Sequence, residues 1–261
     1  MKAFLNHDIV FGPVKSRRLG NSLGINLLPK EYKLCNFNCI YCECGWTYKN
    51  EIKHIKNKFR SVEEVSKALA RRLEELKKQK LPVDSITFAG CGEPTIHPDF
   101  HKIIDMTIIL RNQHYPEAQI SVLSNATMLH NPKVFRALLK VDRNIQKLDS
   151  AITETFLTIN KPLKKLTPGT VIENLKKFHG KVMIQTLFLR GHYQSTYIDN
   201  TTNRELDAWL HALEQIKPQQ VMVYTIARRT PAENLKKIPP AELYSIAEQV
   251  KKLGIDVIVA P

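Results

Sequence analysis

The sequence predicts an α/β protein built on a largely parallel sheet, and three observations favour this class. Short apolar runs typical of buried strands alternate with longer segments whose apolar residues recur at helical spacing. Single helices between strands imply parallel pairing through right-handed crossovers. The chain has 261 residues, of which 43% are hydrophobic, so it can bury a sizeable core. We therefore expect one barrel-like α/β domain rather than two independent ones.

The first predicted strand spans residues 22–28. It follows a basic lead over residues 1–21 that is punctuated by glycines and has no clear period, so no element is predicted there. Further along, Ser61 and Glu64 have the spacing of a capping box, which predicts the start of a helix. Apolar residues then recur at helical spacing through Leu76, and this helix should cover the sheet.

The rest of the chain continues the alternation of strand and helix. Further strands are predicted over residues 85–90, 119–124, 145–149, 182–189 and 220–226, with a candidate seventh strand over residues 255–260. Further helices are predicted over residues 98–113, from Asn131 with Pro132 in the first turn, from Thr167 to Gly180, and over residues 202–216 and 240–253. The pattern amounts to six strand-and-helix units.

The charge is strongly positive, with 39 Lys and Arg against 25 Asp and Glu, a formal net charge of +14. Such an excess favours a polyanionic partner such as RNA, although solvated helix faces also produce it. The basic side chains are dense from Tyr48 to Arg60, where Lys53, Lys56 and Lys58 are candidate substrate contacts. A solvated loop without a partner is the alternative for this segment.

Three thiols, Cys35, Cys39 and Cys42, form a C-x3-C-x2-C motif. Thiolates prefer soft metals such as iron or zinc, and three this close can converge on one inorganic centre. Three ligands to a four-iron cluster would leave one iron open to a small molecule. A zinc site is the alternative, but it usually needs a second ligand pair, and the only other thiols are Cys44 and Cys91.

Disulfides are not expected, because the cysteine count of five is odd and the first residues lack the apolar region of a signal peptide. We therefore expect a reducing, cytoplasmic compartment. No apolar run reaches the ~18 residues that a membrane helix needs, so we expect a soluble protein without membrane contact. We also expect a monomer.

The thiol motif, with aromatic Tyr41 before its third cysteine, resembles that of the radical S-adenosylmethionine (SAM) superfamily. The segments Gly12–Gly20 upstream and Gly90–Thr95 downstream resemble its wyosine-synthase-like branch, which is related to tRNA 4-demethylwyosine synthase. The resemblance runs from about Val10 to the C-terminus. It implies a partial (β/α)6 barrel over residues 22–261, with its active face at the C-terminal edge of the strands.

The resemblance also implies cofactors and roles. Cys35, Cys39 and Cys42 would hold a 4Fe-4S cluster, SAM would chelate the fourth iron, and a donor such as flavodoxin or ferredoxin would supply electrons. Reductive cleavage of SAM would give methionine and a 5′-deoxyadenosyl radical that abstracts hydrogen from a substrate. Glu93 would hold the amino group of SAM. The predicted cofactor contacts are Tyr41, Gly90, Gly92, Glu93, Ser124, Asn125, Lys147, Asp149 and Gln185.

The sequence leaves the roles of two groups of residues open. Lys147 and Asp149 share one face of their predicted strand, where they would serve a ligand or form a strand-end salt bridge. Asn160, Lys161 and Pro162 resemble a family signature for which the sequence offers no mechanism.

The substrate is also open. We expect a nucleic acid, as in tRNA base modification, with Arg17, Arg18 and Arg228 as further candidate contacts, although an arginine pair is equally typical of surface charge. A protein, peptide or small-molecule substrate is the first alternative. A non-enzymatic zinc or iron RNA-binding module is the second. No further cysteine cluster precedes Cys35 or follows Cys91, which argues against the full demethylwyosine-type reaction, since the related synthases use a second cluster.

Overall fold

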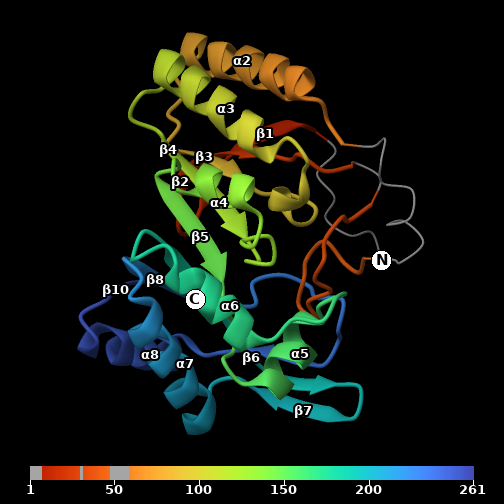
Figure 1. Ribbon diagram of the computed structural model, residues 1–261, viewed down its shortest axis with the longest axis vertical. Coiled ribbons are helices and arrows are strands. Elements are labelled where there is room, and N and C mark those ends of the chain that lie inside the picture. Colours follow the sequence, from red (N-terminus) through yellow and green to blue (C-terminus); the bar gives the residue numbers. More distant parts are fainter. Residues whose placement is uncertain (1–7, 30–31, 48–58) are drawn as a thin grey trace. The chain divides into compact units, whose positions relative to one another are not determined.

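The computed structural model describes residues 8–29, 32–47 and 59–261. Its contacts divide the chain into two compact units. In the described part, the first unit comprises residues up to 35 together with 47–124 and 128–144, and the second comprises 36–46, 125–127 and 145–261. Each unit combines parallel strands with helices that pack on them (Figure 1).

The sheet of the first unit has the order β1 (Val10–Ser16), β2 (Gly20–Ile25), β3 (Ser85–Phe88) and β4 (Gln119–Ser124). β1 runs antiparallel to β2, whereas β2, β3 and β4 are parallel, so their C-terminal ends lie at one edge. No strand is predicted for residues 10–16, yet they form β1 and so belong to this sheet rather than to an irregular lead. The predicted bounds of β4 are confirmed.

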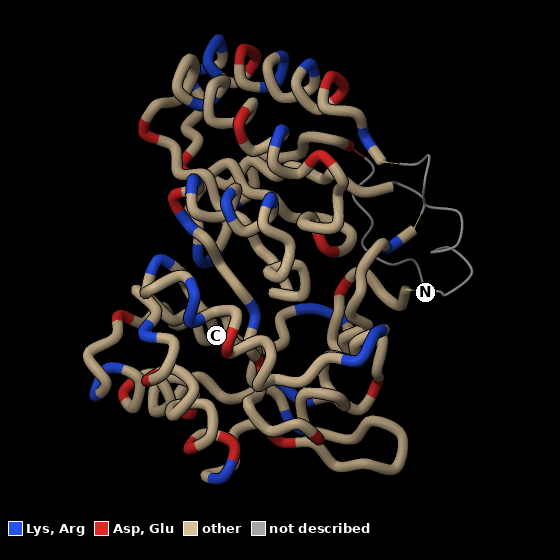
Figure 2. The backbone as a smooth tube through the Cα atoms, in the orientation of Figure 1, with Lys and Arg blue, Asp and Glu red and all other residues tan. Residues whose placement is uncertain are grey.

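Among the residues of this unit that the structure describes, three α-helices accompany the sheet: α2 (Val62–Lys78), α3 (Phe100–His114) and α4 (Pro132–Leu138). The capping box of α2 is confirmed, since the Ser61 hydroxyl accepts from the Glu64 amide at 3.1 Å and the Glu64 carboxylate accepts from the Ser61 amide at 2.6 Å. α2 and α3 pack side by side, and acidic and basic residues intermix along α2 (Figure 2). The predicted cap of α4 by Asn131 is confirmed as well.

The sheet of the second unit has the parallel order β5 (Arg143–Lys147), β6 (Met183–Tyr193), β8 (Gln220–Thr225) and β10 (Asp256–Ala260). Two short strands, β7 (Thr196–Asp199) and β9 (Leu235–Lys237), pair antiparallel with the C-terminal half of β6. β6 therefore has two parts, one inside the parallel sheet and one inside a hairpin that the sequence does not predict.

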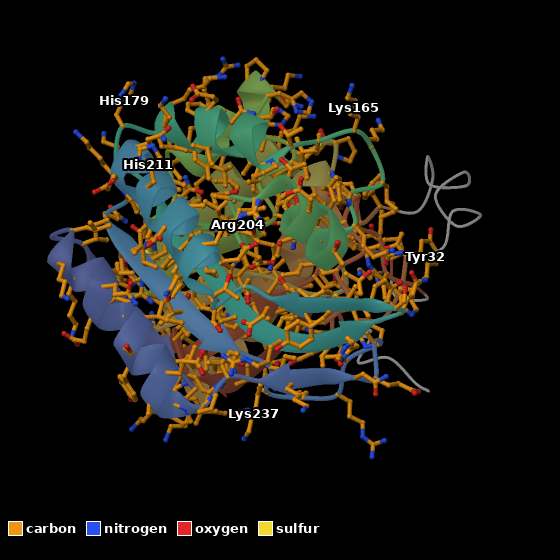
Figure 3. The ribbon with its side chains drawn as sticks, turned by 90° about the horizontal axis from the view of Figure 1, so that it is seen from below. Tyr32, Lys165, His179, Arg204, His211 and Lys237 are labelled. Carbon is orange, nitrogen blue, oxygen red and sulfur yellow. The ribbon has the colours of Figure 1, made fainter. Side chains whose placement is uncertain are left out.

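The helices of the second unit are α5 (Thr153–Asn160), α6 (Pro168–Lys176), α7 (Asn203–Ile216) and α8 (Pro240–Lys252). α7 and α8 pack together beside the sheet (Figure 3). Trp209 of α7 is buried, and its indole N–H donates to the Thr186 hydroxyl at 3.0 Å. α5 is absent from the predicted elements, and α6 ends before the predicted stop at Gly180. None of the described helices is both long and apolar enough to span a membrane.

Candidate active site

The turn Gly90–Glu93 follows β3 at the C-terminal edge of the first unit's sheet, and it is bonded to the residue before the first thiol. The Leu34 amide donates to the Cys91 carbonyl at 2.9 Å, and the Glu93 amide donates to the Leu34 carbonyl at 3.0 Å. Leu34 and Gly92 thus form a parallel bridge. Cys35 therefore follows directly after a residue that is hydrogen-bonded to the turn predicted to bind SAM.

Both glycines of this turn are required by its geometry. Gly92 has φ +146°, and a Cβ there would lie 1.7 Å from the Leu34 carbonyl oxygen. Gly90 has φ +143°, and a Cβ there would lie 2.6 Å from Oδ1 of Asn26. Side chains are excluded by this conformation and by these contacts. The close approach that the glycines permit is therefore to the chain itself at Leu34 and Asn26.

Glu93 is buried, with 2% of its surface exposed. Its Oε1 accepts from the Thr95 amide at 3.0 Å and from the Thr95 hydroxyl, which caps the short helix η2 (Pro94–Ile96). The carboxylate therefore has a local structural role in addition to the SAM contact that the resemblance implies. That contact remains a prediction.

The other predicted residues of the first unit lie in two places. Ser124 is buried at the C-terminal end of β4, at the same edge of the sheet as the Gly90–Glu93 turn. Arg17 and Arg18 lie in the turn between β1 and β2, at the opposite end of β2. The predicted contacts Lys53, Lys56 and Lys58 lie outside the described residues.

In the second unit, the loop that carries Cys39 and Cys42 is anchored to the C-terminal end of α5. The Asn38 amide donates to the Asn160 carbonyl at 3.0 Å, and the Ile40 amide donates to the Ile159 carbonyl at 3.0 Å. A turn then joins Cys39 to Cys42, because the Cys42 amide donates to the Cys39 carbonyl at 3.1 Å. We call residues 36–46 the thiol loop.

The buried carboxylate of Asp149 collects donors from several elements. Its Oδ2 accepts from the Tyr41 hydroxyl at 2.5 Å and from the Asn160 side-chain amide at 2.6 Å. Its Oδ1 accepts from the Leu187 amide at 3.0 Å. Lys147 Nζ lies 3.5 Å from Oδ2 and also donates to the Tyr41 hydroxyl. We call Tyr41, Lys147, Asp149 and Asn160 the Asp149 cluster.

Electrostatics fix the protonation states in this cluster. Burial alone would lower the pKa of Lys147, but the negative charge of Asp149 outweighs it and raises that pKa well above its ordinary value. Burial, followed by the charge of Asp149, raises the pKa of the Tyr41 phenol. Lys147 is therefore an ammonium and Tyr41 a neutral phenol, which accepts from Lys147 and donates to Asp149.

Asn160 is the member of this cluster to which sequence analysis assigned no role. It is fully buried, and its Nδ2 also lies 3.6 Å from Sγ of Cys39, so one amide group connects Asp149 to the second thiol. The unusual run Asn160, Lys161, Pro162 was the only signal in the sequence. Its partner Asp149 lies across a helix and a loop, beyond what spacing can reveal.

The remaining predicted residues of the second unit lie around the cluster and the thiol loop. Gln185 is buried and paired in register with Lys147. The Asn125 side chain donates to Oδ1 of Asn36 at 2.7 Å, at the start of the thiol loop. Arg228 forms a 2.6 Å ion pair with Glu43 of the same loop. Gln185, Asn125 and Arg228 therefore each belong to the surroundings of this loop or of the Asp149 cluster.

The thiol donors suit an iron–sulfur group. All five cysteines are free thiols. In the part of the chain that the structure describes, no three His, Cys, Asp or Glu side chains form a group that could hold a single metal ion. A four-iron cluster requires more widely spaced thiolates than a single metal ion does, because each thiolate binds a separate iron. A hollow of about 540 Å³ between β1 and α2 is lined by none of the predicted site residues.

Comparison with sequence families and curated proteins gives relatives for nearly the whole chain. The profile of the radical SAM superfamily matches residues 32–192. A protein named GTPase Obg from Brachyspira hyodysenteriae is 32% identical over 96% of this chain, and this chain spans 34% of that protein. A UPF0026 protein from Methanocaldococcus jannaschii is 30% identical over 90% of this chain, which spans 68% of that protein.

Solved structures share the fold at low sequence identity. A radical SAM methyltransferase from Sphaerobacter thermophilus has a TM-score of 0.67 and 12% identity over 92% of this chain and 65% of its own. Streptococcus suis SuiB, solved with the precursor peptide SuiA, has a TM-score of 0.62 and 16% identity over 91% of this chain and 48% of its own. Archaeal TYW1 has a TM-score of 0.51 and 14% identity over 93% of this chain and 74% of its own.

These likenesses confirm the predicted fold class, an α/β partial barrel. The superfamily implies SAM and an iron–sulfur cluster as cofactors. Cysteine thiolates, such as those of the thiol motif, are the ligands that an iron–sulfur cluster requires. The chain therefore belongs to the radical SAM superfamily of enzymes.

Proposed function

We propose that this protein cleaves SAM reductively at a 4Fe-4S cluster held by Cys35, Cys39 and Cys42, and that its substrate is a nucleic acid. The observation that carries the proposal is the Asp149 cluster, which connects two residues of the thiol motif, Tyr41 and Cys39, to the ion pair of Asp149 and Lys147. When bound, the cofactors supply one-electron cleavage of the S–C5′ bond, giving methionine and a 5′-deoxyadenosyl radical.

The chain's own contribution in the second unit is to fix the loop that would carry two of the ligands. Tyr41 precedes Cys42, and its hydroxyl is fixed between Lys147 and Asp149. Asn160 bonds the loop through its carbonyl and Cys39 through its side chain. Ligands that are oriented by hydrogen-bonded neighbours bind a metal centre with less reorganisation.

In the first unit, the chain would fix SAM at its amino group. A buried carboxylate at a glycine-bounded turn can accept charge-assisted hydrogen bonds from an ammonium group, which supports this role for Glu93. The bridge between Leu34 and Gly92 holds Glu93 and the start of the thiol motif in one frame. Ser124 at the same edge is a further proposed contact.

The proposed cluster is tested by metal content and by substitution. Anaerobically reconstituted protein should contain iron and sulfide and should release 5′-deoxyadenosine from SAM when reduced. Cys35→Ala, Cys39→Ala and Cys42→Ala should each lose both properties, because two thiolates cannot retain the cluster. Cys44→Ala is the matched control and should keep both. Bound zinc without iron or sulfide would overturn the proposal in favour of a non-enzymatic RNA-binding module.

The substrate class rests on the net charge of +14, which favours a polyanion. Reduced enzyme and SAM should be incubated with total tRNA, with a protein extract and with a small-molecule extract. Of these three additions, we expect only tRNA to raise 5′-deoxyadenosine release above the substrate-free background. Stimulation by the protein or small-molecule fraction, but not by tRNA, would refute the nucleic-acid class.

A further inference from the structure

An aromatic and cationic surface borders the thiol loop within the second unit. Trp46 ends that loop, and its ring centroid lies 6.1 Å from that of Tyr193 at the end of β6. The ammonium of Lys161 lies 4.8 Å from the centroid of the same Tyr193 ring. All three side chains are partly exposed. We call Trp46, Lys161 and Tyr193 the Trp46 patch.

The cation of this patch differs from the arginines near it. Arg190 pairs with Asp199 and Glu242, and Arg228 pairs with Glu43. Among the described residues, no carboxylate pairs with Lys161, whose charge lies over an aromatic face instead. Lysines 164 and 165, which are exposed, follow it on the same loop, and Lys165 points away from the ribbon in Figure 3. This segment therefore offers positive charge to a partner.

The backbone at Lys161 supports a use for its side chain. Lys161 caps α5 with φ +44° and ψ +63°, in the left-handed region that favours glycine or asparagine. Glycine would meet the need of the turn at lower conformational cost. A lysine in this position instead places its ammonium over Tyr193, beside the thiol loop.

The hairpin of β6 and β7 adds rings on its second face. His192 lies opposite Tyr197 across the hairpin, with ring centroids 5.1 Å apart. Tyr197 is 57% exposed, so its ring is accessible to a partner. The end of this hairpin thus presents aromatic rings from both faces, next to the ammonium of Lys161.

We propose that the Trp46 patch is a stacking site for an unpaired base of a single-stranded RNA segment, with Lys161 meeting its phosphate. The inference rests on the proposed nucleic-acid substrate and names the residues that would hold it. Aromatic side chains stack on the faces of bases, which are accessible only where the strand is unpaired, and lysines track the backbone. A reacting base must approach the cofactors, and the patch begins on the loop that would carry two cluster ligands.

Intrinsic fluorescence tests this site without any substitution. The chain contains two tryptophans, Trp46 and Trp209, and Trp209 is only 2% exposed. A base stacked on Trp46 should quench its emission, whereas Trp209 is shielded. Titration of the full-length protein with a short uridine-rich RNA should quench fluorescence in a saturable way. The same length of RNA in a perfect duplex should quench much less, and equal quenching by both would overturn the proposal.

Substitutions then locate the site. Trp46→Ala and Tyr193→Ala should each weaken binding of the single strand roughly 5- to 150-fold, the range expected for loss of one stacked base. Trp46→Phe should restore most of the affinity, because it keeps an aromatic face. Tyr244→Ala, at a 53% exposed aromatic of α8, is the matched control and should bind like the wild type.

Charge is tested in the same way. Lys161→Ala should reduce the slope of log affinity against log salt by about 0.7, the contribution of one phosphate on a single strand. Lys252→Ala, at an exposed lysine of α8, should leave the slope unchanged. Thermal melting of each variant checks that the fold is retained.

The outcomes separate this inference from the proposed function. If the wild type binds single-stranded RNA and all three patch variants bind equally well, the Trp46 patch is refuted while a nucleic-acid substrate stands. If the wild type binds no RNA but an acidic peptide quenches Trp46, both the patch as an RNA site and the nucleic-acid class are refuted.

Discussion

Glu93 and Asp149 are both buried carboxylates that are predicted to serve the cofactors, yet they are held in different ways. Glu93 caps its own turn by accepting from Thr95, two residues further along the chain. Asp149 accepts from Tyr41, Asn160 and Leu187, which are 108, 11 and 38 residues away. The comparison shows that the first unit contains a locally built carboxylate motif, whereas the second contains a carboxylate group assembled by residues far apart in the chain.

The difference has energetic consequences. Removing the Glu93 carboxylate would leave the amide and the hydroxyl of one residue, Thr95, without their acceptor. Removing Asp149 would leave an ammonium, a phenol and two amide donors without their shared acceptor. The second loss should be larger, since an unpaired buried charge is costly. Substitutions in the two regions can therefore test the comparison.

The largest effect is expected for Asp149→Ala. It removes the carboxylate beside the ammonium of Lys147, whose side chain is only 13% exposed, so the free energy of unfolding should fall by about 3–5 kcal/mol. Denaturant unfolding of the apoprotein measures this. The double variant Asp149→Asn, Lys147→Met removes both charges and should recover much of the loss. If the free energy of unfolding of Asp149→Ala lies within about 1 kcal/mol of the wild-type value, the central role of Asp149 is contradicted.

The second prediction concerns Glu93→Gln. The amide oxygen can still accept from the Thr95 amide, so the turn should remain folded. The lost charge should weaken SAM binding by about 1.5–3 kcal/mol, roughly ten- to hundred-fold, while cluster content stays unchanged. Isothermal titration of reconstituted protein measures the affinity. Thr95→Val, which keeps the carboxylate charge, should bind SAM nearly as well as the wild type, and unchanged affinity in Glu93→Gln would place the amino group elsewhere.

The third prediction separates two reasons for a glycine, the close approach of Gly92 to the Leu34 backbone and the strain of a positive φ. Gly92→Ala places a Cβ where the Leu34 carbonyl oxygen lies, so it should destabilise the protein by about 1–3 kcal/mol and reduce the iron retained on reconstitution. Gly254→Ala is the matched control, because Gly254 also has a positive φ, +73°, but no atom lies within 4 Å of the added Cβ. It should cost less stability and no iron. Equal iron loss in both would argue against the bridge.

The smallest effect is expected at Asn160. Hydrogen bonds to cluster sulfurs favour the more negative reduced state. Asn160→Ala removes the donor 3.6 Å from Cys39, so the midpoint potential of the cluster should fall by on the order of 59 mV, a tenfold change for one electron. Redox titration followed by electron paramagnetic resonance measures it. Asn200→Ala removes a buried amide bonded to the Asp149 and Leu187 carbonyls and should leave the potential unchanged.

Much of the architecture could be predicted because its signals are local. α2 begins at a capping box and carries its apolar residues at helical spacing, and β4 is a short apolar run between turns. The thiol motif and the glycines of the Gly90–Glu93 turn are likewise contiguous in sequence. Local hydrogen bonding and side-chain periodicity determine such features whatever the rest of the chain does.

Other elements depend on their neighbours. β1 contains Gly12 and Pro13, which are typical of turns. It lies at the edge of the sheet and pairs only with β2, and an edge strand tolerates a proline because one of its sides needs no backbone N–H donors. α5 has no side-chain cap to mark its start, and β7 exists only as the partner of β6. Sequence reasoning missed these three because tertiary pairing, rather than propensity, stabilises them.

The sequence by itself indicated membership of the radical SAM superfamily, through three thiols at fixed spacing and a glycine-bounded carboxylate. Only the tertiary structure decided how the thiol loop is held. It places Tyr41, Lys147, Asp149 and Asn160 in one hydrogen-bonded group, and it brings Lys161 and Tyr193 to Trp46 at the end of the loop. The physical reason is that buried charges need partners, and in a parallel sheet these partners come from strand ends and helix ends that are far apart in the chain.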